Sequence, residues 1–156
     1  PNVLDRLELR ICDYVSDIDL LLAITALLEL RVIHLFENMG TLDPLITSQF
    51  SMDQLMKICD QNEIEAAQKS LDAELIHWRD GTKVICRDWI KNLLVDLSET
   101  AEKFNMIHLL KPIYKVLDEG NQSMKWIKQY KEGSSIEDIM KYAIQEMIKS
   151  EQENIY

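Results

Sequence analysis

Residues 4–12 open the chain, and from Arg6 onward their polar and apolar side chains alternate strictly. This period of two is typical of a half-buried strand. The apolar face carries Leu7, Leu9 and Ile11. The polar face carries Arg6, Glu8, Arg10 and Cys12. A lone strand is unstable because its backbone groups are unpaired. We therefore expect this strand, placed within residues 1–13, to pair with a missing upstream sheet, a second copy of the chain or a hairpin predicted over residues 74–86.

A long apolar segment over residues 16–39 predicts the first helix. Ser16 or Asp17 is a suitable N-cap, and Gly40 ends the pattern. Apolar side chains occur nearly all round this helix, and a helix of that kind is buried on every side. We expect a buried helix here, followed by a loop over residues 41–50.

Residues 51–70 predict two short helices in close succession. The first ends near Asp60 and the second begins at Asn62. The hairpin over residues 74–86 comes next, because two short strand-like segments flank an Asp-Gly pair, which favours tight turns.

The remaining region, residues 88–150, has the pattern of successive helices. Asp88 and Ser135 are candidate N-caps, and Pro112 places one helix start near Lys111. Gly120 ends the second of the four expected helices, which cover 89–104, 106–117, 123–131 and 136–148.

Together these elements predict one α+β domain over residues 1–156. We expect it to be predominantly α-helical, with one N-terminal strand and one hairpin packed with about six helices. A length of 156 residues fits a single domain. Hydrophobic residues make up 47% and charged residues 28% of the chain, which is typical of a folded globular protein.

The charge balance excludes some classes of partner. Lys and Arg total 17 against 27 Asp and Glu, so the formal net charge is -10. Nucleic acid and anionic membrane surfaces need dense positive charge, and we expect neither as a partner. The longest apolar stretch, residues 20–28, is shorter than the about 20 residues that span a bilayer. A small basic edge, either solvated or a local binding patch, is formed by Lys125, Lys128 and Lys131.

The cysteines and tryptophans indicate an ordinary core. Cys12, Cys59 and Cys86 form no Cys-x-x-Cys pair, so we expect reduced and mostly buried thiols and a cytoplasmic location. We expect the three tryptophans to be core anchors, and they are Trp78, Trp89 and Trp126.

The polar face of the N-terminal strand holds the candidate chemistry. Arg6, Glu8 and Arg10 follow one another about 7 Å apart along such a face. The carboxylate can hold a cation such as Mg²⁺, and the two guanidinium groups can bind phosphate or carboxylate oxygens. Alternating charges of this kind also occur on solvated strand faces with two salt bridges.

Three segments of the chain resemble the carboxylate–amine ligases. These are the bacterial-type glutamate–cysteine ligases, a branch of the glutamine synthetase superfamily. The segments are Arg6 to Asp13 with the Leu/Ala-rich helix that follows, Asn62 to Ile76 with its Ser-Leu-Asp-Ala stretch, and Asp118 to Asn121. The resemblance covers nearly the whole chain, as the C-terminal portion of a longer enzyme with a glutamine-synthetase-like catalytic fold.

This resemblance implies roles for four residues. Glu8 is implied as a magnesium ligand, and Arg6 as a contact to the nucleotide phosphates. Arg10 is implied as a catalytic residue that holds a substrate carboxylate or the transferred phosphate. Asn62 is implied near the mouth of the site. The implied reaction uses ATP to phosphorylate the side-chain carboxylate of glutamate, and an amine, typically that of cysteine, then attacks the acyl phosphate.

The chain departs from the family where Asn62 is followed by basic residues. Glu63, Glu65 and Gln68 stand there, and Lys69 is the remaining cation. The two glutamates invert the field that a phosphate or a carboxylate would meet. The substrate then differs, the activity is lost, or the alignment is shifted, and we expect the chain alone to be inactive. The alternatives are a catalytically degenerate relative and a self-standing helical interaction module that pairs through its N-terminal strand.

Overall fold

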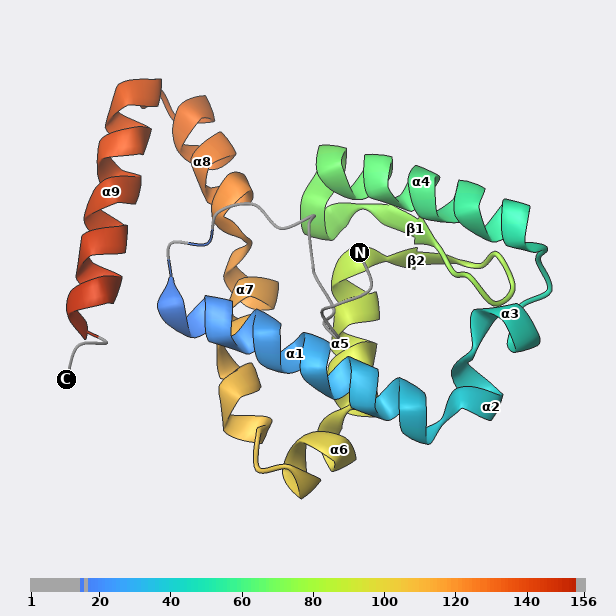
Figure 1. The fold of residues 1–156 in the computed structure, drawn as a ribbon. Helices are drawn as coiled ribbons and strands as arrows, with labels where there is room; N and C mark the ends of the chain where they lie inside the picture. The colour runs from blue at the N-terminus through green and yellow to red at the C-terminus, as the bar shows by residue number, and fades with distance from the viewer. Residues whose placement is uncertain (1–14, 16, 154–156) are drawn as a thin grey trace, which may run out of the picture.

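The computed structural model of the chain describes residue 15 and residues 17–153. The predicted strand over residues 4–12, and with it Arg6, Glu8, Arg10 and Cys12, lies outside these residues. The described residues form a helical body and a hairpin, and Figure 1 shows their arrangement.

The first helix, α1 (Ile18–Glu37), begins at the N-cap that the sequence predicts. The Asp17 carboxylate accepts a hydrogen bond of 3.1 Å from the backbone N–H of Leu20. Such a cap satisfies one of the amide groups that have no partner at a helix start. The helix ends at Glu37 and is capped by Asn38, slightly before Gly40.

The prediction that α1 is buried on every side is wrong. Ala23, Ala26 and Leu30 are buried, whereas Leu22 is 51% and Phe36 is 72% exposed. The helix lies across α6 (Ser98–Lys103), the 3₁₀ helix η2 (Ile107–Leu110) and α7 (Lys111–Glu119) and contacts all three. These neighbours cover one face, so the other apolar face stays open in the described part of the chain.

The segment 41–50 is not a continuous loop. It holds two single-turn helices, α2 (Met39–Leu42) and α3 (Pro44–Thr47). Asp43 starts the second of them by accepting a hydrogen bond of 2.8 Å from the N–H of Leu45, and Pro44 suits the first helical position.

One long helix, α4 (Met52–Lys69), replaces the two helices predicted over residues 51–70. Ser51 and Gln54 form a reciprocal capping box at its start, with each side chain bonded to the other residue's backbone N–H. Neither glycine nor proline interrupts it between Asp60 and Asn62, so the helix continues. The 3₁₀ helix η1 (Ser70–Asp72) comes directly after it.

The predicted hairpin is confirmed. Strands β1 (Glu74–Ile76) and β2 (Lys83–Ile85) pair antiparallel, with Leu75 opposite Val84. Gly81 in the connecting turn has φ 78°, a backbone conformation that favours glycine. A Cβ atom there would lie 3.0 Å from the Phe50 ring.

The rest of the chain is helical, as predicted, with different breaks. The helix predicted over 89–104 begins at Cys86, before Asp88, and is interrupted at Leu97. The predicted start at Lys111 is confirmed, and Gly120 ends that helix with φ 88°. The helices not yet named are α5 (Cys86–Asp96), α8 (Gln122–Lys131) and α9 (Ile136–Glu153).

The core forms where α1 crosses α5, α6 and α7. Leu30, Leu94, Leu97 and Leu110 are its largest fully buried side chains. Helices α8 and α9 form a pair at one side of this core, and α4 with the hairpin lies at another (Figure 1). The predicted fold class, a predominantly helical α+β chain with one hairpin, is confirmed for the described residues.

Candidate functional site

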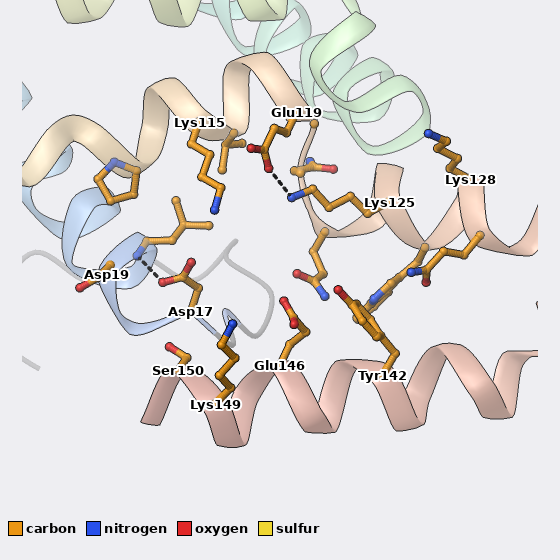
Figure 2. Close-up of a pocket in the computed structure, with 18 of the residues that line it drawn as sticks. Asp17, Asp19, Lys115, Glu119, Lys125, Lys128, Tyr142, Glu146, Lys149 and Ser150 are labelled. Atoms are coloured by element: carbon orange, nitrogen blue, oxygen red, sulfur yellow. Dashed lines mark hydrogen bonds and ion pairs between the residues drawn. The ribbon is translucent and has the colours of Figure 1, made fainter. Parts of the chain in front are cut away.

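A cleft of about 650 Å³ lies between α7, α8, α9 and the start of α1 (Figure 2). Small-molecule sites are typically clefts of about 300–1,000 Å³. Helix α9 supplies Tyr142, Glu146 and Lys149, whose spacing places them on one side of the helix. The backbone N–H of Ile18 donates a hydrogen bond of 3.2 Å to Ser150 Oγ, which joins the start of α1 to α9.

Charged side chains of both signs line the cleft. Three ion pairs occur among them: Lys125 with Glu119 at 3.1 Å, Lys128 with Glu132 at 3.9 Å, and Lys149 with Glu153 at 3.8 Å. The charged groups of these pairs are 47–76% exposed, and exposed pairs contribute about 0–1 kcal/mol each to stability. The pairs therefore add little to the stability of the fold. Their main effect is to neutralise three lysines and three glutamates of the cleft.

Lys115 and Glu146 also line this cleft, from α7 and α9. Figure 2 shows the Lys115 side chain directed into the cleft, with Glu146 projecting from α9 on the opposite side. Neither side chain has an ion-pair partner within 4 Å among the described residues, in contrast to the lysines of the three pairs. Asp17 and Asp19 line the cleft too and have no ion-pair partner among the described residues, so the cleft holds one unpaired ammonium and three unpaired carboxylates.

The cleft wall formed by α8 contains two buried polar atoms without a hydrogen-bond partner among the residues that the structure describes. They are Trp126 Nε1, a donor, and Gln129 Oε1, an acceptor. Each such group costs about 1–3 kcal/mol when it is left unpaired. Trp126 lies on the cleft wall. Like Trp78 and Trp89 it is half-buried and outside the buried core, so the prediction that the three tryptophans are core anchors is wrong.

Asn62 does not line this cleft. Its Oδ1 accepts a hydrogen bond of 2.7 Å from the N–H of Ile76, and its Nδ2 donates one of 2.8 Å to the carbonyl of Ile76. Both ends of the amide therefore hold β1 against α4. Its implied place near the mouth of a substrate site stays a prediction.

The acidic residues that depart from the family pattern lie on α4. Glu63 and Gln68 are exposed, and Glu65 pairs with Lys69 at 2.8 Å. The end of α4 is joined to the start of α8, because Asn121 Nδ2 donates a hydrogen bond of 2.6 Å to Ser70 Oγ. Asn121 lines the cleft, whereas Glu63, Glu65 and Gln68 do not.

The described cysteines differ in their surroundings. Cys59 is exposed, so the prediction of mostly buried thiols is wrong at that position. Cys86 is half-buried, and burial raises the pKa of its thiol, while the nearby Arg87 guanidinium lowers that pKa to a smaller extent. The Cys86 thiol is thus poorly ionised and weakly reactive at neutral pH.

Residues 17–153 contain no group of three His, Cys, Asp or Glu side chains that could hold a metal ion. The implied magnesium ligand, Glu8, lies outside the described part of the chain. The described residues therefore do not fit a complete magnesium site. Among the same residues, no helix is long and apolar enough to cross a membrane.

The sequence carries no direct signal of the cleft. Two of its unpaired charges, Lys115 and Glu146, are 31 positions apart, and only the arrangement of α7 and α9 brings them to one cavity. Part of the cleft is visible in the sequence as the basic edge on α8. Lys125 and Lys128 of that edge line the cleft, whereas Lys131 does not.

Comparison with known proteins gives one match. Residues 1–153 match the family model of glutamate-cysteine ligase family 2. No curated protein and no solved structure shows significant similarity to the chain. Because the match covers nearly every residue, including Glu8 and the helices around the cleft, the chain belongs to glutamate-cysteine ligase family 2.

Proposed function

We propose that the chain is the C-terminal portion of an ATP- and magnesium-dependent carboxylate–amine ligase of the bacterial glutamate–cysteine type. The family match over residues 1–153 is the observation that carries this proposal. In such a reaction the glutamate side-chain carboxylate is converted to an acyl phosphate, and an amine such as that of cysteine displaces the phosphate. Glutathione biosynthesis is the corresponding cellular role.

The polar face of the N-terminal strand supplies the proposed site residues. Glu8 binds magnesium, and Arg10 holds the substrate carboxylate or the transferred phosphate. Arg6 contacts the nucleotide phosphates. Guanidinium groups suit the two anionic roles because they donate paired hydrogen bonds to oxygen atoms in a fixed plane.

The remainder of the chain forms a helical cap on the catalytic sheet of the longer enzyme. Two strands of three residues each make up the sheet in the described residues, and a sheet of that size is marginally stable alone. The strand at residues 4–12 pairs with the rest of the enzyme or with a second copy of the chain. The chain alone is therefore inactive, and Asn62 acts at the mouth of the completed site.

The intact mass of the natural protein tests the C-terminal assignment. A mass well above the 18.2 kDa of these residues, with the additional sequence upstream, is the expected result. A natural protein of that same mass would contradict the assignment, because it leaves no room for a catalytic sheet.

A kinetic assay of the intact protein tests the activity. We expect ATP hydrolysis that requires both glutamate and an amine, and a loss of at least about 100-fold in the Glu8→Gln variant, in line with the loss of a direct ligand or second-sphere partner. The matched control is Glu137→Gln, an exposed carboxylate on α9 that pairs with Lys141. Equal activity of Glu8→Gln and the control would overturn the role of Glu8, and no ATP hydrolysis with any amine would overturn the ligase.

A further inference from the structure

Helices α8 and α9 form an arm that packs weakly on the rest of the described chain. The two helices contact mainly each other, and Figure 1 shows the pair at one side of the molecule. No residue of α8 is buried, and Ile139 is the buried residue of α9. Met124, at the start of α8, packs against the core. Gly120 joins the arm to α7 with φ 88°, a backbone conformation open to glycine, so this junction can act as a hinge.

A hydrogen bond next to this junction ties the arm to the end of α4. Asn121 Nδ2 donates it to Ser70 Oγ over 2.6 Å, although the two residues are 51 positions apart. Asn121 is also the N-cap of α8, because its Oδ1 accepts a hydrogen bond of 3.1 Å from the N–H of Met124. The bond between Ser70 and Asn121, called the latch below, therefore fixes the direction in which α8 leaves the body of the chain. A second and longer tie, of 3.2 Å, joins Ile18 N–H to Ser150 Oγ.

The acceptor of the latch has a strained backbone. Ser70 has φ 56° and ψ −130°, a combination that a residue with a Cβ atom rarely adopts. Such strain persists where the surrounding structure imposes it, and it is frequent in segments that switch between two arrangements. Breaking the latch loses one hydrogen bond but leaves Ser70 free to relax. The second effect offsets part of the first, so the latched and the released arm are closer in free energy than the hydrogen bond alone would make them.

We propose that the latch holds the arm in place beside the cleft, and that the arm turns on Gly120 and widens the cleft when the latch breaks. The cleft lies between the arm, α7 and the start of α1, so this turn changes access to Asp17 and Lys115 without unfolding a helix. The ten residues of α8 span about 15 Å, and a turn of about 20° moves the far end of that helix by about 5 Å. The device is separate from the ligase reaction and does not depend on it.

Distances between pairs of nitroxide labels measure the turn on the intact protein. The labels are attached to keto amino acids encoded at exposed positions, so the native thiols stay unlabelled. Glu29 and Lys131 report the separation of α1 from the far end of α8, and Glu29 with Gln61 gives a reference between α1 and α4. We expect loss of the latch to lengthen the first distance by about 5 Å and to leave the second unchanged. An unchanged first distance, or an equal change in both, would overturn the proposal.

Two variants remove the latch from opposite sides. Ser70→Gly loses the acceptor and suits the positive φ, whereas Asn121→Ser loses the amide donor and keeps a capping oxygen. Because both remove the same bond, the double variant should show the same distance as either single variant. Additive changes would indicate two unrelated local effects and would contradict the latch.

The matched control is Asn105→Gly at the end of α6. Asn105 is the other described non-glycine residue with a positive φ, of 54°, and this change relaxes it far from the latch in the sequence. The distance between Glu29 and Lys131 should stay unchanged, and a lengthening as large as that of Ser70→Gly would show that relief of strain anywhere loosens the chain. Ser70→Gly relieves strain at its own position, so it decides the question alone if Asn121→Ser folds poorly.

Discussion

Leu30 and Phe36 occupy the same helix in opposite environments. Leu30 is 0% exposed and belongs to the core, whereas Phe36 is 72% exposed. Leu30→Ala should lower the free energy of unfolding by about 2–5 kcal/mol, because it removes buried area and leaves a cavity. Phe36→Ala should change it by about 0.5 kcal/mol or less. Urea unfolding of both variants measures the difference, and equal losses would show that α1 is covered on both faces.

Asn62 is the predicted site residue whose contacts the structure describes. Asn62→Ala removes both hydrogen bonds to the Ile76 backbone and should lower the free energy of unfolding by about 1–3 kcal/mol. Asn62→Asp keeps the acceptor for the Ile76 N–H but places a carboxylate oxygen against the Ile76 carbonyl oxygen, so it should lower the free energy of unfolding at least as much as Asn62→Ala.

Kinetics of the same two variants distinguish two roles of Asn62, which are to hold β1 in place and to bind substrate. Substrate binding by Asn62 predicts a rise in KM beyond what the loss of folded protein explains. An unchanged KM in the folded fraction would contradict the role at the mouth of the site.

Cys86 gives stability a dependence on pH. Burial raises the pKa of its thiol, so the folded state holds the proton more tightly than the unfolded state does. The stabilisation that Cys86 provides is fully present below the thiol pKa of the unfolded chain, about 8.5. It is lost as the pH rises through the thiol pKa of the folded state. The free energy of unfolding should therefore fall above about pH 8.5, and this fall should be smaller in Cys86→Ala. The same slope in both proteins would contradict the assignment.

At the scale of elements, local signals predicted several of the boundaries. Ser51 and Asp17 supply caps, Pro112 fixes a helix start, and Gly120 provides the positive φ at which a helix ends. Each of these effects acts within one turn of the chain, so it can be read from neighbouring residues.

The features that the sequence did not predict depend on contacts between elements that are distant along the chain. The break at Leu97 lies in a segment with good helical pattern, and that residue is fully buried where α5 meets α6. The exposed face of α1 and the polar cleft likewise depend on which helices pack together. The alternating sequence of residues 4–12, by contrast, carried part of the family resemblance that the match over residues 1–153 supports.

The capping box of α4 gives a prediction at this scale. Ser51→Ala removes the acceptor for the N–H of Gln54 and should lower the free energy of unfolding by about 0.5–2 kcal/mol. Ser123→Ala is the matched control, because the exposed Ser123 hydroxyl donates to the Asn121 side chain and is not itself a cap. Urea unfolding compares them, and equal losses would contradict a specific contribution of the cap.

At the scale of the whole molecule, the apolar surface of the described chain is large. One exposed face, at the end of α1 and on α3, includes Phe36, Leu45 and Ile46. A second face runs along α9 at a spacing of four residues, through Ile136, Met140, Ile144 and Ile148. Apolar patches of this kind mark surfaces that pack against other protein, or that cause aggregation when left open. Both faces agree with a chain that is covered by the remainder of a longer enzyme or by a second copy.

The chain of residues 1–156 should therefore associate as its concentration rises, and sedimentation velocity measures this directly. Replacing one face at a time identifies its contribution. Met140→Lys with Ile144→Glu changes two side chains that are 51% and 50% exposed, so it should weaken association through α9 without unfolding the helix. Leu45→Lys with Ile46→Glu does the same on α3, where both residues are more than 60% exposed. A chain that stays monomeric across the whole concentration range would show that neither face drives association, and the apolar surface would then have to be explained by a partner other than this chain.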